Sequence, residues 1–271
     1  MRGDSLAELA GLLTTARLGR VHEHHEEAIT STNDRALEWL AAGAPDGALV
    51  TADAQTAGRG RLGRPWSSPP GQDLYASVIL RPGTPTAGFG ALALAVGVGL
   101  REGLLAALDQ DLPGLALKWP NDLLLDGRKL GGILCESRWR GREVEVVVGF
   151  GVNVHRSAEQ FEPALREHAT SLARHLGPRG QDRRRGRAQI LAAILHAIER
   201  TLERFVAGGF AAIRSRYEPH CLVIGRAIVV EQAGGERIEA IAAGLDEDGA
   251  LLARPHAGGP SFRVQSADVW L

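Results

Sequence analysis

The sequence changes character at about residue 220, and this change constrains the fold more than any other feature. Up to that point, long apolar segments that suit helices alternate with short segments rich in β-branched residues. After His220 there are only short apolar runs, separated by the turn-forming pairs Gly234-Gly235, Asp248-Gly249 and Gly258-Gly259. Short strands at regular spacing are typical of a small β-barrel. We therefore expect an α/β domain over residues 1–220 and a small all-β domain over residues 221–271.

Within the first domain, periodicity and turn signals predict a mixed α+β arrangement. Strands are expected at residues 47–55, 73–82, 115–119 and 143–154. The segment 122–137 is expected to form a hairpin that turns at Asp126-Gly127. Helices are expected at residues 4–18, 34–43, 86–108, 187–206 and 210–219, with a short or broken helix at 163–176. Thr30 or Ser31 can cap the second of these helices. Residues 181–187, QDRRRGR, are expected to be a solvated linker.

The composition excludes several classes of protein. A net charge of −1 and a pI near 6.8 argue against a dedicated nucleic-acid binder. Cys135 and Cys221 are far apart in the sequence, which favours a reducing, cytoplasmic setting over a disulfide framework or a structural zinc site. The first residues lack a secretory apolar core, and the apolar run 90–100 is too short to span a bilayer.

Lysine is used unusually sparingly. Of the 31 basic residues only Lys118 and Lys129 are lysine, and they lie 11 positions apart in KWPND and RKLGG. A slim ammonium with rotatable donors can fit where the broad, planar guanidinium of arginine cannot. The pair therefore indicates chemistry that arginine does not supply, unless the bias reflects only genome composition.

The segment GRGRLGRPW, residues 58–66, combines glycine with Arg59, Arg61 and Arg64. Its G-x-G-x-x-G pattern does not predict a dinucleotide site, because Pro65, Pro69 and Pro70 prevent the helix that such a site needs. Neither a kinase lysine on the next strand nor the GK[ST] of a phosphate-binding Walker loop is present. The segment instead predicts a mobile loop that binds an anion, and its arginines are expected to lack fixed partners until a ligand arrives. An RGG-like RNA-binding tag is the alternative.

Five motifs in this order resemble those of biotin protein ligases: TSTND (30–34), DAQTAGRGRLGRPW (53–66), LKWPNDLLL (117–125), KLGGIL (129–134) and GFGVNV (149–154). The resemblance runs from about residue 20 to the C-terminus. It implies a class II synthetase-like mixed sheet flanked by helices, followed by an SH3-like β-barrel. It also implies a two-step reaction, in which biotin and ATP give biotinyl-5′-adenylate and pyrophosphate, and a carrier-domain lysine then accepts the biotin.

The resemblance also implies residue roles. Lys129 is similar to the lysine that bridges the biotin carboxylate and the α-phosphate, and Arg61 to the loop arginine that retains the adenylate; both are the expected catalytic residues. Residues expected around biotin are Ser31, Thr32, Asn33, Gln55, Gly58, Arg59, Gly60, Arg61 and Lys129. Residues expected around ATP are Arg59, Arg61, Arg64, Trp66, Lys118, Asn121, Asp122 and Asn153.

The implied cofactors and partners follow from the same resemblance. Mg²⁺ is expected on the ATP phosphates, with Asp122 as a possible ligand and no dedicated metal site. The partner is expected to be a biotin carboxyl carrier domain of a carboxylase, and the enzyme to be a cytoplasmic monomer or homodimer. Only about 20 residues precede Val21, too few for the DNA-binding winged helix of some members. No adenine-stacking tryptophan is evident in ATSL, residues 169–172.

Two other functions stay open. A lipoate or octanoate transferase would share the fold, although such enzymes usually lack the GRGRxGRxW loop. A non-catalytic biotin sensor would be expected to lack the lysine or the loop arginine, and both are present. His22, His24 and His25 are expected at an exposed strand edge rather than around a metal.

Overall fold

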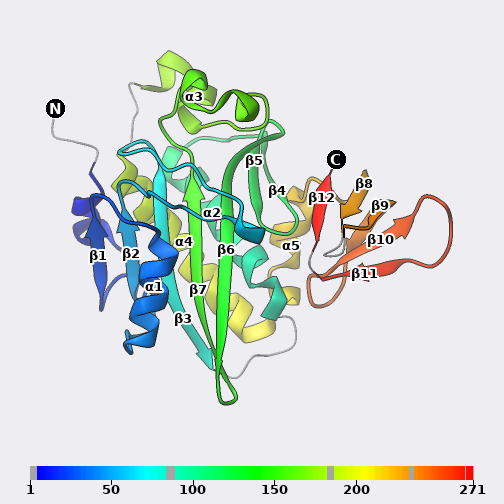
Figure 1. The fold of residues 1–271 in the computed structure, drawn as a ribbon, viewed down its shortest axis with the longest axis horizontal. Helices are drawn as coiled ribbons and strands as arrows, with labels where there is room; N and C mark the ends of the chain where they lie inside the picture. The colour runs from blue at the N-terminus through cyan, green and yellow to red at the C-terminus, as the bar shows by residue number, and fades with distance from the viewer. Residues whose placement is uncertain (1–4, 84–88, 182–185, 232–234, 266, 271) are drawn as a thin grey trace.

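The computed structural model describes residues 5–83, 89–181, 186–231, 235–265 and 267–270. It contains a large mixed sheet with helices on both faces and a separate C-terminal antiparallel sheet (Figure 1). The α/β class expected from the sequence is confirmed. Most of the expected linker 181–187, the start of the expected helix 86–108 and Gly234 of one expected turn lie outside the described residues.

The large sheet has seven strands in the order β1-β2-β3-β7-β6-β5-β4. Their bounds are β1 Glu23–Glu26, β2 Leu49–Ala52, β3 Leu74–Gly83, β4 Leu115–Lys118, β5 Asp122–Leu125, β6 Arg128–Arg140 and β7 Glu143–Val152. Only β1 and β2 run parallel, and each later pair is antiparallel. The β5–β6 turn lies at Asp126 and Gly127 as predicted, and both residues have positive φ, as a tight hairpin turn demands.

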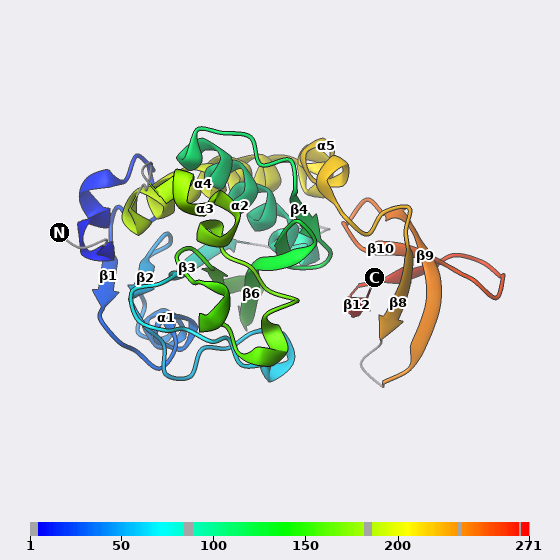
Figure 2. The same cartoon turned by 90° about the horizontal axis from the view of Figure 1, so that it is seen from above.

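Helices cover both faces of this sheet, as the view from above shows (Figure 2). On one face lies α1, Thr32–Ala41, and on the other lie α2, Leu92–Leu108, and α4, Arg187–Gly208. The shorter helices are α3, Leu172–Gln181, and α5, Arg214–Tyr217. Ser31 caps α1 as predicted, with its Oγ accepting a hydrogen bond from the Asp34 N–H at 3.4 Å. The capping places residues 31–34 at a fixed position beside the strands.

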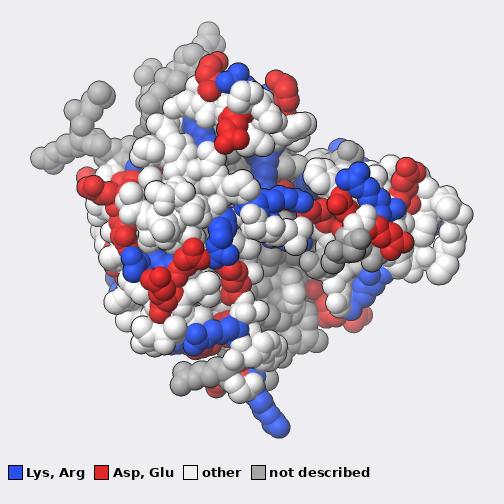
Figure 3. All heavy atoms as spheres, viewed as in Figure 1, with Lys and Arg blue, Asp and Glu red and all other residues white. Residues whose placement is uncertain are grey.

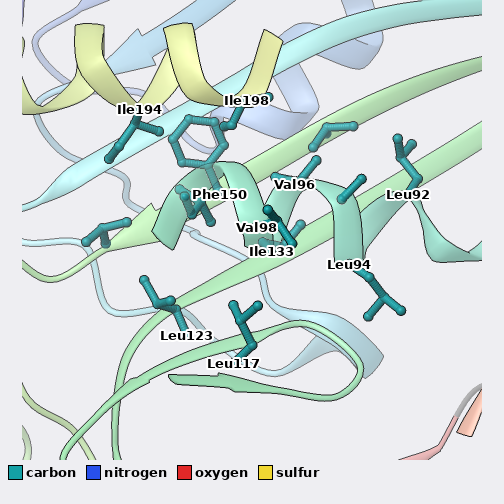
Figure 4. Close-up of a cluster of buried hydrophobic side chains, with 14 of the residues drawn as sticks. Leu92, Leu94, Val96, Val98, Leu117, Leu123, Ile133, Phe150, Ile194 and Ile198 are labelled. Atoms are coloured by element: carbon teal, nitrogen blue, oxygen red, sulfur yellow. The ribbon is translucent and has the colours of Figure 1, made fainter. Parts of the chain in front are cut away.

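The main core lies between the sheet and the α2–α4 pair. Apolar side chains from α2, α4, β4, β5, β6 and β7 meet there, including Val98, Ile133, Phe150 and Ile194 (Figure 4). The two helices approach each other so closely that side chains would not fit between them. A Cβ on Gly99 would lie 2.6 Å from the Ile198 Cα, and one on Gly103 would lie 2.4 Å from the Ile194 Cα. Glycine at these two positions therefore permits the contact that seals this face of the sheet.

Two predicted helices are wrong in extent. Of the segment 4–18, the described residues 5–18 form only a 3₁₀ helix at Leu6–Leu12. Beyond it, the N–H groups of Ala16, Arg17 and Leu18 donate to the carboxylate of Glu199 on α4, at 2.6 to 2.9 Å. In a longer helix these N–H groups would donate to backbone carbonyls of the same helix, but here they donate to Glu199. The segment 210–219 is likewise divided into two 3₁₀ turns and the short α5.

The C-terminal sheet confirms the predicted change to short strands. Its order is β11-β10-β9-β8-β12, with bounds β8 Ala227–Glu231, β9 Arg237–Leu245, β10 Leu251–Pro255, β11 Phe262–Val264 and β12 Asp268–Trp270. A hydrogen bond connects this sheet to the α/β domain: the Trp119 Nε1 donates to the Gly249 carbonyl at 3.1 Å. A bridge between Leu117 and Cys221 adds backbone pairing near this junction. These contacts hold the β9–β10 turn and the segment before β8 against the end of the large sheet near β4.

Candidate active site

A cavity of about 650 Å³ opens on the α1 face of the large sheet. Its walls come from the start of α1, the glycine- and arginine-rich loop, the strands β5 to β7, the segment 165–169 and β12 of the C-terminal sheet. Of the residues predicted for biotin or ATP, all but Gly58 line this cavity. A volume of this size is typical of small-molecule sites. The motifs, which are spread over more than 120 residues of sequence, are therefore brought to one place.

The cavity forms where the side chains on one face of the strands change from apolar to small or polar. On β3 and β7, Ile79 and Val147 pack beneath α1. Continuing along the same face of these strands brings Ser77, Gly149 and Gly151. Phe150 points the other way, into the main core. The GFG of the GFGVNV motif thus keeps one face of β7 filled and leaves the other open.

The glycines of β7 are required by what lies above them. A Cβ on Gly149 would lie 1.9 Å from the Asn33 Oδ1, and one on Gly151 would lie 2.6 Å from the Trp66 Nε1. Trp66 also approaches Gly132 of β6, where a Cβ would be 3.4 Å from its ring. The tryptophan therefore lies against the sheet and carries the loop with it.

One end of the cavity is a buried network of neutral side chains. Thr32 N–H donates to the Gln55 Oε1 at 2.8 Å, and the Gln55 Nε2 donates to the Ser68 Oγ at 2.9 Å. Ser77 Oγ lies 2.8 Å from the Thr32 Oγ1 and 2.6 Å from the Asn33 Oδ1. The amide of Asn33 is held on its other side by Glu136 at 2.8 Å. Because Thr32, Asn33 and Ser77 are all buried, these groups keep fixed orientations without a ligand.

Gly58 lies at the base of the loop and not in the cavity wall. A Cβ at this position would lie 2.5 Å from the Trp66 carbonyl oxygen and 2.8 Å from the Ser68 Oγ. The Trp66 N–H donates to the Gly58 carbonyl at 2.8 Å, and Gly60 N–H donates to the Arg64 carbonyl at 2.7 Å. The loop is therefore a narrow backbone-paired hairpin, and Leu62 at its tip has φ of 56° and is exposed.

The other end of the cavity is charged, and its cations have partners. Arg59 borders the neutral network: it pairs with Asp34 and, at 3.1 Å, with Glu136, the carboxylate that also holds Asn33. Arg61 donates to the Asn121 Oδ1 at 3.1 Å, and Arg64 pairs with Asp268 of β12. The expectation that the loop arginines lack fixed partners is therefore wrong. Sequence alone could not show it, because the partners come from α1, β6 and the distant C-terminal sheet.

The carboxylates around Arg59 change its proton affinity. Partial burial opposes its charge, but Glu136 and Asp34 outweigh that effect, so the pKa of Arg59 is raised. On the face seen in Figure 3, acidic and basic side chains lie beside one another between the large sheet and the C-terminal sheet. The cationic loop is therefore neutralised locally by the protein itself.

Both lysines lie in the same cavity. The Lys129 Nζ is 2.7 Å from the Asp122 Oδ1 and 5.6 Å from the centre of the Trp66 ring. The Lys118 Nζ is 5.7 Å from the centre of the Trp270 ring. Burial lowers the pKa of Lys118; Asp122 opposes this shift, and the charge of Lys129 adds to it. The positive charge of Lys129 therefore acts on Lys118 within the cavity.

The two predicted asparagines hold backbone in place. Asn153 is buried, and its Nδ2 donates to the Thr170 carbonyl at 2.9 Å, while its N–H donates to the Leu130 carbonyl at 2.8 Å. The Asn121 Nδ2 donates to the Ile133 carbonyl at 2.8 Å. Thr170 N–H in turn donates to the Lys129 carbonyl at 2.9 Å. Asn153 thus holds both the residue after Lys129 and the segment at Thr170 that pairs with the Lys129 backbone.

Several residues that shape the site were not predicted from the sequence. Ser77 and Glu136 could have been found from strand alternation with the motif residues. Arg156 is 2% exposed, pairs with the buried Asp73 and donates to the Ser67 carbonyl, which anchors the end of the loop. Asp268 and Trp270 lie about 200 residues from the loop, and no pattern in the sequence connects them to it.

The predicted histidine edge is present only in part: β1 is an edge strand that carries His24 and His25, but the His25 side chain is only 14% exposed and His22 precedes the strand. His24 lies 3.0 Å from Glu26, and His25 lies 3.3 Å from Asp53. Across the described part of the chain, no group of three or more His, Cys, Asp or Glu residues is placed to hold a metal ion. None of the helices in those described segments combines the length and apolarity needed to cross a bilayer.

Comparison with known proteins gives the class first. Residues 26–153 match the Biotin/lipoate A/B protein ligase family, and residues 223–263 match the Biotin protein ligase C terminal domain. The chain is 34% identical over 268 residues to the Bifunctional ligase/repressor BirA of Bacillus spizizenii, covering 98% of this chain and 79% of that protein. It is also 34% identical to the Biotin--[acetyl-CoA-carboxylase] ligase of Mycobacterium tuberculosis, over 88% of this chain and 85% of the relative.

Similar solved structures agree. The biotin protein ligase from Aquifex aeolicus in complex with biotin and ATP has a TM-score of 0.75 and 26% identity, covering 92% of this chain and 98% of that one. The chain therefore belongs to the biotin protein ligase family, which is a family of enzymes.

Proposed function

We propose that this protein is an ATP-dependent biotin protein ligase. It would activate biotin to biotinyl-5′-adenylate and then transfer the biotin to a lysine of a biotin carboxyl carrier domain. The observation that carries the proposal is the division of one cavity into a neutral, hydrogen-bonded end and a cationic end that contains Lys129. This arrangement suits a ligand with a polar, uncharged head and a carboxylate that must meet a polyphosphate.

The neutral end would bind the ureido ring of biotin. A cyclic urea offers two N–H donors and one carbonyl acceptor, and the fixed side chains of Thr32, Asn33 and Gln55 supply both kinds of partner. Because these groups are oriented before the ligand arrives, little reorganisation is needed on binding. This geometry would leave the valeryl carboxylate pointing towards Lys129.

The cationic end would support the first chemical step. A biotin carboxylate oxygen attacks the α-phosphorus of ATP, the bond from that phosphorus to the bridging oxygen breaks, and pyrophosphate leaves. Two anions must approach each other in this step, so a cation at the point of attack stabilises the transition state. Lys129 can leave Asp122, 2.7 Å away, and contact both anions with a slim ammonium group.

The loop would retain the product of that step. The adenylate is a mixed anhydride that hydrolyses readily, and a closed loop excludes water from it. Arg61, already 3.1 Å from Asn121, would hold its phosphate, while Trp66 keeps the loop against the sheet. In the second step the carrier lysine Nζ attacks the acyl carbon, AMP leaves, and an amide forms after loss of a proton.

Mg²⁺ would enter with ATP and not through a metal cage of the protein. The described residues hold no cluster of three acidic, histidine or cysteine ligands. Asp122, Glu167 and Asp268 are the carboxylates that line the cavity, and Asp122 is the one beside Lys129. Magnesium usually binds through one or two carboxylates together with substrate phosphates. When bound, it would neutralise phosphate charge.

The test is biotin-dependent exchange of labelled pyrophosphate into ATP, run in parallel with lipoate and octanoate. We expect exchange with biotin and not with the other acids, followed by labelling of a purified carrier domain. Faster exchange with lipoate or octanoate than with biotin would indicate a lipoate or octanoate ligase, the other activity named in the matched family. Biotin binding without any exchange would indicate a sensor.

A further inference from the structure

Asp268 makes a contact across the cavity that the reaction outlined above does not use. It lies on β12 of the C-terminal sheet, and its carboxylate pairs with Arg64 at the end of the loop. Its other oxygen is 4.0 Å from the Arg61 Nη1. Asp268 therefore faces two of the three loop arginines with one negative group.

The surroundings of Asp268 favour this pairing. Its side chain is 13% exposed, whereas that of Arg64 is 56% exposed. The next residues of the strand, Val269 and Trp270, also line the cavity. The Arg64 guanidinium lies 6.0 Å from the centre of the Trp270 ring, and Lys118 approaches the same ring at 5.7 Å. The arginine is thus drawn to the C-terminal sheet by a carboxylate and an aromatic ring together.

The Asp268 carboxylate contacts the same guanidinium groups that the proposed function assigns to the nucleotide phosphates. Guanidinium groups bind carboxylate and phosphate oxygens with the same fork geometry. A ligand phosphate at the cationic end must therefore either take Arg64 away from Asp268 or lie beside an additional negative charge. The first possibility costs the contribution of the internal pair and the second costs charge repulsion, so both oppose nucleotide binding.

We infer that Asp268 is an internal anion that competes with the nucleotide phosphates for Arg64 and Arg61. It holds the loop against the C-terminal sheet before ATP binds and is displaced when the polyphosphate arrives. The C-terminal sheet thereby lowers the affinity for ATP while keeping the loop from adopting other positions. This inference rests on the proposed function for the identity of the anion.

The principal test is Asp268→Asn, which keeps the shape of the side chain and removes its charge. A partly exposed ion pair contributes modestly, so we expect ATP to bind about three- to tenfold more tightly. The dissociation constant of biotin should not change, because its end of the cavity is neutral. The measurements are the KM for ATP in pyrophosphate exchange and calorimetric titration with biotin.

The control is Asp248→Asn. Asp248 pairs with Arg263 at 2.7 Å in the same sheet but does not line the cavity, so ATP affinity should stay as in the wild type. Combining Arg64→Gln with Asp268→Asn tests whether the effect acts through Arg64. The gain in ATP affinity caused by Asp268→Asn should be smaller in the Arg64→Gln background than in the wild type. A gain that persists in full in the double variant would overturn the assignment to Arg64.

Unchanged or weaker ATP binding in a folded Asp268→Asn protein would overturn the inference. If the wild type shows no exchange at all, the proposed function fails instead. The internal anion is then tested by titrating inorganic pyrophosphate and a non-hydrolysable ATP analogue while following tryptophan fluorescence. The same tightening in Asp268→Asn is expected there, and its absence counts against Asp268.

Discussion

The two ends of the cavity are built in opposite ways. At the neutral end, Thr32, Asn33 and Ser77 are buried and bonded to one another before any ligand is present. At the cationic end, Arg64 and Lys129 are partly exposed and held by carboxylates of the protein. One end keeps its bonds when a ligand binds, and the other must exchange them.

The difference teaches how a single cavity can combine selectivity with turnover. Buried neutral groups discriminate strongly because a ligand that lacks the matching donor or acceptor leaves them unpaired. Paired cations can release a product, because the internal carboxylates recover the cations when the phosphate departs. The predictions below test each side of this comparison.

The largest effect is expected from Lys129→Arg. A guanidinium would crowd Trp66 and Gly132, whose Cβ position lies 3.4 Å from the Lys129 Cε, and would be misplaced between the two anions. Adenylation should fall by about 10²–10³, measured by pyrophosphate exchange on protein of normal thermal stability. The matched change Lys118→Arg should have a much smaller effect. Near-normal exchange in Lys129→Arg would remove the lysine from the chemical step.

The second effect is on how long the enzyme retains the biotinyl-adenylate. Arg61→Gly should leave adenylation measurable but shorten the residence of the adenylate about ten- to a hundredfold, the range expected for loss of one charge-assisted hydrogen bond. The released anhydride should then label exposed lysines of bystander proteins, detected by blotting. Arg142→Gly, in the β6–β7 turn away from the cavity, is the control. Complete loss of adenylation without bystander labelling would place Arg61 in the first step.

The third effect tests the neutral end. Ser77→Ala removes the hydroxyl between Thr32 and Asn33 and should lower the free energy of unfolding by about 1–3 kcal/mol. Biotin should bind about tenfold more weakly, while the KM for ATP stays the same. Exposed Ser261→Ala is the control. If ATP and biotin are affected equally, the two ends are not separable in the way proposed.

The smallest effect is a pH dependence. Because burial lowers the pKa of Lys118 below its ordinary value of 10.5, the ammonium group should lose its charge earlier than a free lysine as the pH rises. ATP affinity should therefore be full at neutral pH and fall by a few-fold at alkaline pH, roughly the contribution of one partly exposed charge pair. Lys118→Arg should abolish this fall. A wild-type profile identical to that of the arginine variant would contradict the assignment.

The sequence predicted those features that depend on local residue chemistry. The Asp126-Gly127 turn, the Ser31 cap and the broken segment 163–176 follow from conformational preferences of a few neighbouring residues. The motif residues could be placed near a ligand because their order resembled a family. Features that depend on distant partners were not accessible. The helix at 4–18 was shortened by Glu199, and the arginines were paired by residues that no local pattern connects to them.

The β6–β7 hairpin has a consequence for insertions and deletions. Its two strands pair residue by residue from Arg140 and Glu143, at a turn of only two residues, to Gly131 and Val152 beside the cavity. Side chains alternate between faces, so a shift of one residue would send Phe150 into the cavity and Gly149 into the core. The length of a remote, solvent-facing turn is therefore as much a determinant of the ligand pocket as the residues that line it.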